Sequence, residues 1–504
     1  MDVGLVAAVG GPLIGIACFV VANRLARPRD ARPSRPARRA RSEVSQGRAA
    51  SIPASVRDAS EATLGLRPPI ARSALVNFST QVTVGVLSLI NVLLVARLLG
   101  PTGRGEVAFL TAIAYLTSQL ATMGVQWANG NFAGSEPRTR PALATNSVLL
   151  AFLFGSAAAG FVAALVAVFP AVGGHASRGL LFLALASIPL LVLQNYLMLL
   201  VLADYGFRAF NSAIVLAPLT NVSVNGALAV FDLLSPATAF STWVGGQALV
   251  TAVLALHLER SAPGFGRPDA RLAWRTVVFG AKAHFGRVML LGNYRLDQWI
   301  VGAMSGSRAL GLYSVAVAWA ESVFYLPTAV QTVQRPDLVR ASPTEAGRQA
   351  ATAFRATLLA SVPLALGLIV AAPVLCVTIL GQQFHGSVEQ LRILAPGVVG
   401  IAALKLLGSA LTAQGRPLLE TAAIGIALAV TVALDVLLIP PYGGLGAAVA
   451  STAAYTIGGA AVALIFVRGL GSRLDELAPR MNEVPRFWRQ VQDSLPHRWR
   501  PADR

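Results

Sequence analysis

The chain reads LVNFSTQVTVGVLSLINVLLVARL over residues 75–98. As a helix, this apolar stretch is long enough to cross about 30 Å of hydrocarbon, which takes about 20 residues. Comparable stretches recur near residues 3–23, 107–128, 143–169, 179–202, 212–234, 239–257, 284–304, 310–333, 352–379, 388–412, 418–439 and 444–467. They predict an all-α polytopic membrane protein with twelve core transmembrane helices and one extra N-terminal transmembrane helix.

The composition is typical of a chain whose main solvent is lipid. Of its 504 residues, 55% are hydrophobic and 13% are charged, and the mean hydropathy is +0.63. In a soluble protein the net charge of +18 would suggest a nucleic-acid partner. The cations instead gather at the ends of apolar stretches, at 24–72, 260–282, 335–348 and after Arg468. This positive-inside pattern predicts a multi-pass protein of the cell membrane with a cytoplasmic C-terminus, and no nucleic-acid partner.

The first apolar stretch, Val3–Ala22, has no Lys or Arg before it and a dense run of Arg after it. This order predicts an uncleaved transmembrane anchor over residues 1–25, with the N-terminus outside. A cleaved signal peptide is the alternative, but such peptides carry positive charge ahead of the apolar core. Residues 26–73 are rich in Arg and Pro, which predicts a flexible cytoplasmic linker; a docking site for partner enzymes is the alternative.

The sequence lacks motifs of catalysis and metal binding. It has no phosphate-cradling P-loop, no cluster with metal-ligand spacing and no nucleophile elbow. Cys18 and Cys376 lie far apart in apolar stretches, so a disulfide framework is not expected. The expected outer loops are short, whereas a membrane glycosyltransferase or polymerase would need a large one. We therefore expect no enzyme activity, no cofactor and no metal, with such an enzyme as an alternative.

An internal repeat divides the core into two halves. Residues 99–105 (LGPTGRG) can be laid over residues 305–311 (SGSRALG), because each segment has two glycines five apart and precedes an apolar helix. Glycine adopts positive φ at little cost, which suits a tight turn between helices. Internal duplication is common in transporters. The predicted parts are an N-terminal six-helix lobe over 74–258, a cytoplasmic connection over 259–283, a C-terminal six-helix lobe over 284–468 and a basic cytoplasmic tail over 469–504.

Several short segments carry a resemblance to a known family. They are Ala96–Pro101 with Gly103 and Gly105, Arg295–Asp297 followed by Gly302 and Gly311–Ala316, Gly381 with Phe384, Leu391–Pro396, and Ile439–Gly443 followed by Gly446–Ala448. In this order and spacing the chain resembles the polysaccharide and lipid-linked oligosaccharide flippases of the multidrug/oligosaccharidyl-lipid/polysaccharide export superfamily. The resemblance covers about residues 74–468 and leaves out the N-terminal helix and the linker.

The resemblance implies two six-helix lobes around a central cavity that opens alternately to each side of the membrane. It implies a flippase that moves undecaprenyl-diphosphate-linked oligosaccharide from the inner to the outer leaflet, driven by an ion gradient or the membrane potential. Its partners would be this polyprenyl-diphosphate-linked sugar and the lipid bilayer, with polysaccharide polymerases or glycosyltransferases as further candidates, and we expect a monomer. Alternatives are a peptidoglycan-precursor (lipid II) flippase and a multidrug exporter, whose pocket for cations would be lined by acids.

Cationic side chains inside apolar stretches predict a binding site for a diphosphate. A charge at the bilayer centre costs about 2.5 to 3.5 kcal/mol on insertion scales, so such groups face protein or water. Arg287, Arg295 and Lys405 are the candidates for the substrate cavity. Arginine can make forked contacts with a phosphate, and lysine can meet it as a point charge. Arg355 is a weaker candidate, because its side chain could extend to the membrane edge.

Two acids are candidates for ion coupling. Glu321 belongs to a stripe with Tyr325, Thr328, Thr332 and Arg335, whose spacings of 4, 3, 4 and 3 place them on one helical face. Asp297 shares a helical face with Asn293. Glu321 could bind a proton or a sodium ion, or could instead make a structural hydrogen bond to a neighbouring helix.

Neutral amides form a further set of candidates in the first half. Asn77 and Gln81 lie on one stripe, and Asn221 and Asn225 are one helical turn apart. Amides can hydrogen-bond sugar hydroxyls, but they also join helices to one another inside membranes. Both interpretations stay open for these four residues, and Gln194 with Asn195 is ambiguous in the same way.

Overall fold

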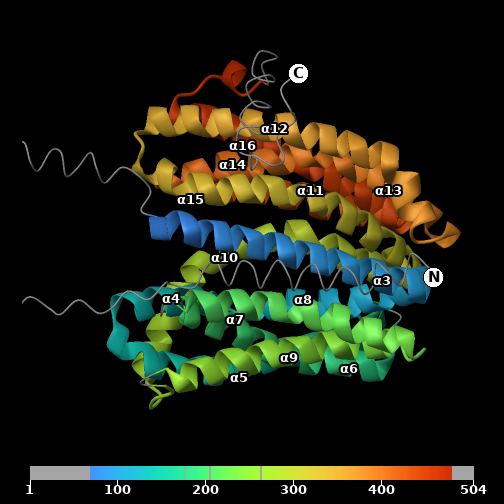
Figure 1. Cartoon of the computed structure of the whole chain (residues 1–504), viewed down its shortest axis with the longest axis horizontal. Coiled ribbons are helices and arrows are strands. Elements are labelled where there is room, and N and C mark those ends of the chain that lie inside the picture. Colours follow the sequence, from blue (N-terminus) through green and yellow to red (C-terminus); the bar gives the residue numbers. More distant parts are fainter. Residues whose placement is uncertain (1–67, 175, 204–205, 262–263, 479–504) are drawn as a thin grey trace, which may run out of the picture.

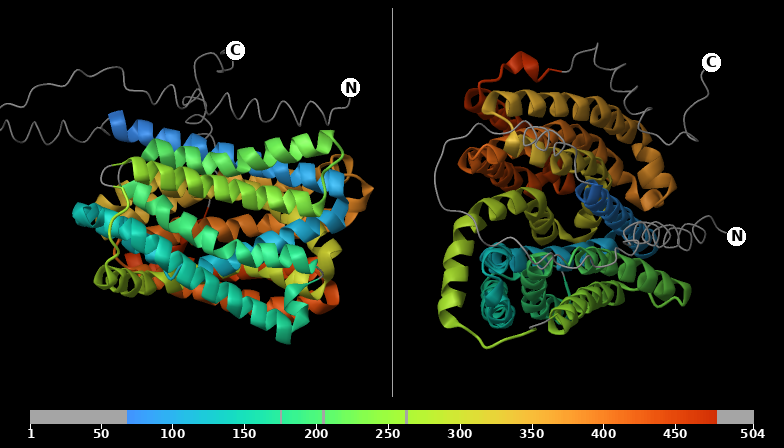
Figure 2. Two further views of the ribbon diagram at one scale, coloured as in Figure 1. Left: turned by 90° about the horizontal axis from the view of Figure 1, so that it is seen from below. Right: turned by 60° about the vertical axis from the view of Figure 1, so that its left-hand side comes forward.

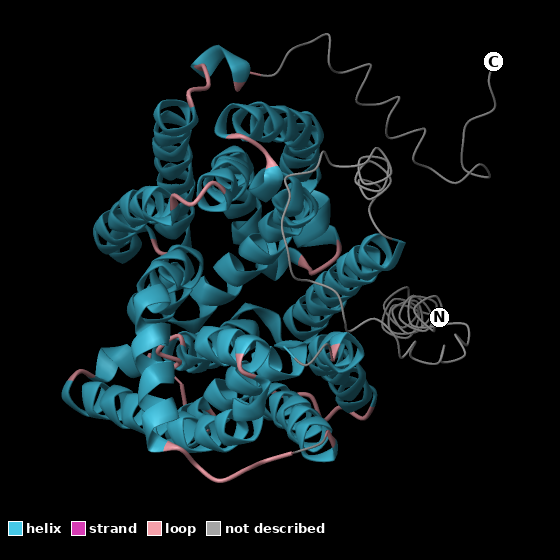
Figure 3. Ribbon diagram, turned by 90° about the vertical axis from the view of Figure 1, so that its left-hand side faces the viewer, coloured by secondary structure: helices cyan, strands magenta, loops and turns pink. Residues whose placement is uncertain are grey.

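The computed structural model describes residues 68–174, 176–203, 206–261 and 264–478. Within these ranges every regular element is a helix (Figure 3), which confirms the predicted all-α class. The predicted anchor over residues 1–25, most of the linker and most of the tail lie outside the described residues. Helix α3 begins at Pro68, so residues 68–73, expected to belong to the linker, are helical.

The helices form two bundles, and α3 of the first bundle lies along the second (Figure 1). The first bundle contains α3 (Pro68–Ala121), α4 (Val125–Ser135), α5 (Arg140–Val168), α6 (Arg178–Ala186), α7 (Ile188–Ala203), α8 (Phe207–Val230) and α9 (Pro236–Arg260). The second bundle contains α10 (Ala270–Met304), α11 (Gly306–Arg340), α12 (Pro343–Pro373), α13 (His385–Leu394), α14 (Val398–Ala413), α15 (Pro417–Tyr442) and α16 (Gly444–Leu470). Short one-turn helices connect several of these elements.

Local sequence signals start several of these helices. Ser235 accepts a hydrogen bond from the backbone amide of Thr238, and Pro236 occupies the first turn of α9. Asp269 accepts hydrogen bonds from the backbone amides of Arg271 and Leu272, which begins α10 well inside the expected 259–283 connection. Such caps satisfy backbone amides that have no partner within the helix.

Ten helical segments in the described part of the chain are long and apolar enough to cross a membrane. One of them, Ser79–Ala121, contains two of the predicted spans, because α3 is interrupted at Gly100. Helix α10 is not among the ten, because polar residues from Lys282 to Gln298 reduce its hydropathy. The chain is therefore an all-helical, multi-pass membrane protein.

The two segments of the predicted repeat lie against each other between the bundles. Gly100 and Gly306 both have positive φ, of 68° and 84°, as expected for the turns that precede two apolar helices. A Cβ atom on Gly311 would lie 1.7 Å from the carbonyl oxygen of Pro101. The backbones of the two segments therefore touch where α3 and α11 meet.

Helix α10 connects the two bundles (Figure 2). Its first half packs on α4, where a Cβ atom on Gly280 would lie 2.6 Å from the carbonyl carbon of Gly124. Its second half packs on α15 and α16 of the second bundle. Residues of α10 beyond the middle of the helix are thereby held beside α11, at the centre of the molecule.

Candidate functional site

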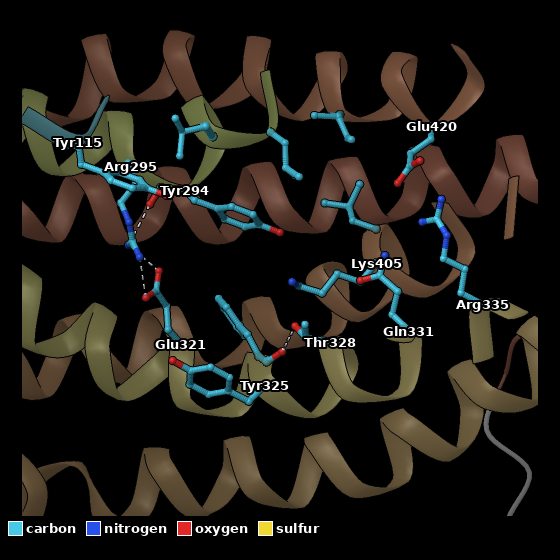
Figure 4. Close-up of a pocket in the computed structure, with 15 residues that line it drawn as sticks. Tyr115, Tyr294, Arg295, Glu321, Tyr325, Thr328, Gln331, Arg335, Lys405 and Glu420 are labelled. Carbon is cyan, nitrogen blue, oxygen red and sulfur yellow. Dashed lines mark hydrogen bonds and ion pairs between the residues drawn. The ribbon is translucent and has the colours of Figure 1, made fainter. Parts of the chain in front are cut away.

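A cavity of about 610 Å³ opens within the second bundle (Figure 4). We call it the second-bundle cavity. Helices α10, α11, α14 and α15 line it, and Tyr115 of α3 contributes from the first bundle. Its polar lining consists of Tyr115, Tyr294, Arg295, Glu321, Tyr325, Thr328, Gln331, Arg335, Lys405 and Glu420.

Helix α11 contributes its polar stripe to this cavity. Glu321, Tyr325, Thr328 and Arg335 all line the second-bundle cavity, because their spacing places them on one face of a continuous helix. The side chain of Thr332, predicted on the same stripe, lies outside what the structure describes. The helical face read from the sequence is therefore a cavity wall.

Arg295 and Glu321 form a forked ion pair across the cavity. Arg295 Nη1 donates to Glu321 Oε1 at 2.7 Å, and Nη2 donates to Oε2 at 3.1 Å. The two side chains remain 31% and 29% exposed, so both are open to the cavity. Glu321 therefore has a cationic partner on the neighbouring helix, and Arg295 presents the rest of its guanidinium to the open space.

Lys405 reaches into the same cavity from α14, as Figure 4 shows. Its Nζ lies 5.8 Å from the centroid of the Tyr294 ring, within the range of a cation–π interaction. Arg335 and Glu420 face each other at the other end of the cavity. Positive groups thus line the cavity along its length.

A second cavity, of about 770 Å³, lies between the bundles and shares Tyr115, Arg295, Glu321 and Tyr325 with the first. We call it the interface cavity. Arg104 of α3 lines it, and the buried Nε of Arg104 has no hydrogen-bond partner among the described residues. Arg104 and Arg295 therefore both line the interface cavity, whose wall otherwise consists largely of apolar side chains.

Sequence reasoning placed Arg104 in a short loop and missed it as a site residue. In the structure α3 resumes directly after the break at Gly100, so Arg104 lies in a helical turn rather than a loop. A signal was present, because Arg104, Ala108, Thr111 and Tyr115 are spaced 4, 3 and 4 and all line the interface cavity.

Asp297 lies apart from these cavities, inside the second bundle. It is 2% exposed, and its Oδ2 accepts hydrogen bonds from Tyr313 Oη at 2.5 Å and Ser451 Oγ at 3.1 Å. Asp435 of α15, which sequence reasoning did not single out, is fully buried nearby, and neither of its carboxylate oxygens has a hydrogen-bond partner among the described residues. The second bundle therefore contains two buried acids, one fully partnered and one not.

The three predicted amides whose side chains the structure describes do not gather around a cavity. Asn225 Nδ2 donates to Asn91 Oδ1 at 2.8 Å, so this residue joins α8 to α3, and Asn221 is buried one turn away. Gln81 is exposed and lines none of the three cavities described here. The side chains of Asn77 and Arg287 lie outside what the structure describes. For Asn225 the structure thus shows the helix-joining contact.

Arg355 also lies away from the cavities. Its guanidinium donates to the backbone carbonyl of Glu476 and to Thr352 Oγ1, and the residue is 8% exposed. Arg355 therefore attaches the segment that follows α16 to α12. Among the described residues there is no group of three or more His, Cys, Asp or Glu side chains that could hold a metal ion.

Comparisons with known proteins agree with this architecture. A family model described as "Polysaccharide biosynthesis protein" matches residues 94–389. The structure titled "Lipid II flippase MurJ, inward closed conformation" aligns with a TM-score of 0.63 at 14% identity, covering 84% of this chain and 93% of that one. An inward-facing multidrug resistance MATE family transporter of the MOP superfamily aligns with a TM-score of 0.64 at 12% identity, covering 79% and 96%. No curated protein sequence matches the chain.

The two helical bundles therefore have the fold of the lipid II flippase MurJ and of the MATE family transporter. The family model covers more than half of the chain, so the protein belongs to the polysaccharide biosynthesis protein family. The family resemblance read from the sequence is thereby confirmed.

Proposed function

We propose that the protein is a flippase for polyprenyl-diphosphate-linked oligosaccharide, working by alternating access in the cell membrane. The observation that carries the proposal is the pair Arg104 and Arg295, which both line the interface cavity between the bundles. A sugar-diphosphate headgroup crossing the bilayer needs such cationic groups, because it loses its hydration in the hydrocarbon layer. The polyprenyl tail would stay in lipid.

The cavity lining favours an anionic substrate over a cationic drug. Glu321 is neutralised by Arg295 through two hydrogen bonds, and Glu420 faces Arg335. Arg104 and Lys405 add further positive charge. An exporter of organic cations would instead need acids open to the cavity.

The proposal extends to the arrangement in the membrane. We assign the core to twelve spans, counting two in α3 and one in α10, and arrange them as two six-helix lobes over 74–258 and 284–468. The basic ends of the helices, the linker over 26–73, the connection over 259–283 and the tail over 469–504 then lie in the cytoplasm. The anchor over 1–25 places the N-terminus outside, and the flippase would work as a monomer.

We further propose that the buried acids Asp297 and Asp435 couple transport to an ion gradient. A fully buried carboxylate without a hydrogen-bond partner fits a position that accepts a proton or a small cation such as sodium. The hydroxyl of Ser451, already within 3.1 Å of Asp297, is a further oxygen at the same place. Glu321, the other acid predicted from the sequence, would serve in the cavity as the partner of Arg295.

The decisive experiment is to delete the gene for this protein from the cells that carry it. The lipid-linked intermediate that then accumulates in the cytoplasmic leaflet is identified. We expect a polyprenyl-diphosphate-linked oligosaccharide, restored to normal by the wild-type chain but not by Arg104→Ala. Arg97→Ala is the matched control, because Arg97 is exposed on the same helix and lines none of the three cavities. Accumulation of peptidoglycan precursor would indicate a lipid II flippase, and drug hypersensitivity without any accumulation would indicate an exporter.

A further inference from the structure

A third cavity, of about 300 Å³, lies within the first bundle. We call it the amide pocket. Helices α3, α7, α8 and α9 line it, and its polar side chains are Tyr115, Ser118, Gln119, Gln194, Asn195 and Gln247. No charged side chain of the described residues lines the amide pocket, in contrast to the cationic cavities beside it.

The amides of this pocket are paired but retain unused hydrogen-bonding groups. Gln194 Nε2 donates to Gln247 Oε1 at 2.9 Å, and Gln119 Nε2 donates to Asn195 Oδ1 at 3.4 Å. A side-chain amide carries two donor hydrogens and a carbonyl acceptor. Within the described part of the chain, Gln247 Nε2 and Gln119 Oε1 have no hydrogen-bond partner. The pairs thus hold the amides in place while leaving a donor on α9 and an acceptor on α3.

The amide pocket adjoins the interface cavity, because the two cavities share wall residues. Tyr115 lines the amide pocket, the interface cavity and the second-bundle cavity, and Gln247 lines the first two. Tyr115 is 36% exposed and lies at the Arg295 end of the second-bundle cavity in Figure 4. A ligand whose anionic part lies between Arg104 and Arg295 can therefore extend past Tyr115 into the first bundle.

The polar, uncharged lining of the amide pocket determines which part of the ligand can bind there. A charged group would have no counter-charge there, and burying an unpaired charge is costly. An apolar group would leave the free amide donor and acceptor without partners. A hydroxyl both donates and accepts, so a neutral sugar residue can pair with both amides. The volume is at the lower end of ligand pockets, which suits a small part of a larger molecule.

We propose that the amide pocket binds an uncharged sugar residue of the lipid-linked substrate, next to the diphosphate. This inference rests on the proposed flippase function and divides the substrate between the bundles. The second bundle and Arg104 bind the diphosphate, and the first bundle binds the sugar through hydrogen bonds with Gln119 and Gln247.

The test uses the full-length protein in lipid nanodiscs and two probes, undecaprenyl diphosphate and undecaprenyl diphosphate bearing N-acetylglucosamine. Binding of each probe is measured by native mass spectrometry. We expect the wild type to bind the sugar-bearing probe on the order of tenfold more tightly, as one or two added hydrogen bonds would give. The double variant Gln119→Leu, Gln247→Leu should lose this preference and keep its affinity for undecaprenyl diphosphate. Gln81→Leu is the matched control and should behave as the wild type.

The outcomes separate the sugar pocket from the proposed function. Arg104→Ala should weaken binding of both probes and keep the ratio between them. Equal affinity of the wild type for the two probes would overturn the sugar pocket while leaving the flippase proposal standing, and so would a full sugar preference in the double variant. Failure of the wild type to bind either probe would overturn the flippase proposal and the sugar pocket together. Thermal unfolding of each variant checks that it folds.

Discussion

Gly105 of α3 lies directly against Gly311 of α11, so that the two bundles meet backbone to backbone. A Cβ atom on Gly105 would lie 1.6 Å from the carbonyl oxygen of Ser307 and 2.8 Å from the amide nitrogen of Gly311. Neither contact involves a side chain that could rotate away. The close contact between the two bundles at this point therefore depends on glycine at position 105.

Gly105→Ala should separate the bundles at this point. Overpacking of this kind typically costs about 1 to 3 kcal/mol, which would lower the population of the closed state about 5- to 150-fold. Spin labels on Thr102→Cys and Tyr442→Cys, in a background without Cys18 and Cys376, would report a longer distance by pulsed electron paramagnetic resonance. Gly160→Ala is the control, because a Cβ atom there meets nothing within 4 Å. An unchanged distance in Gly105→Ala would show that the contact is not a gate.

Exchanging the charges of Arg295 and Glu321 tests whether Arg295 binds substrate or only stabilises the fold through its ion pair. The double variant Arg295→Glu, Glu321→Arg can rebuild the ion pair, so we expect thermal unfolding close to that of the wild type. Transport should stay about 10- to 150-fold lower, because a hydrogen bond to a charged group is worth about 1.5 to 3 kcal/mol and the arginine is now on the wrong helix. Recovery of transport in the swapped variant would mean that the pair acts through its contact alone.

Asp435→Asn should not destabilise the protein, although the site is fully buried. A charged side chain at the bilayer centre costs about 2.5 to 3.5 kcal/mol, and the neutral amide avoids this cost. Thermal unfolding in choline chloride should therefore occur at the same or a higher temperature than in the wild type. Sodium chloride should stabilise the wild type and not the variant, with Asp232→Asn, at an exposed position, as the control. A lower unfolding temperature in both salts would show that Asp435 has a structural partner.

Glu136→Gln should have little effect on stability or transport. Glu136 and Arg275 form an ion pair of 2.8 Å between the end of α4 and the first half of α10, but their side chains are 41% and 52% exposed. Exposed pairs of this kind contribute about 0 to 1 kcal/mol. Chemical denaturation and a transport assay would check this, and a large loss of transport would reveal a role of the pair in moving the bundles.

The helices themselves were predictable because apolar length and glycine position are local properties. The stripe of Glu321, Tyr325 and Thr328 forms a cavity wall because one continuous helix carries all three residues. Arg104 was not predicted as a site residue, because the segment after Gly100 reads as a loop, whereas the structure has a helix there. The helical spacing of Arg104 to Ala108 and Tyr115 is nevertheless present in the sequence.

Hydrogen bonds and contacts between residues far apart in the chain could not be predicted from the sequence. Asn225 and Gln247 are similar amides in neighbouring helices, yet one joins α8 to α3 and the other lines the amide pocket. Asp297 and Asp435 come together only because α10 packs on α15. No local sequence pattern indicates that these two acids are neighbours.

Composition and apolar spans were enough to predict a helical membrane protein, because each span must satisfy its backbone hydrogen bonds within its own helix. The family was predicted from the resemblance of short segments such as Ala96–Pro101, and the family model confirmed it. The side chains that share the cavities depended on how the helices rotate and pack against one another. That arrangement arises from contacts between residues far apart in the chain, such as Gly105 with Gly311, and not from any local pattern.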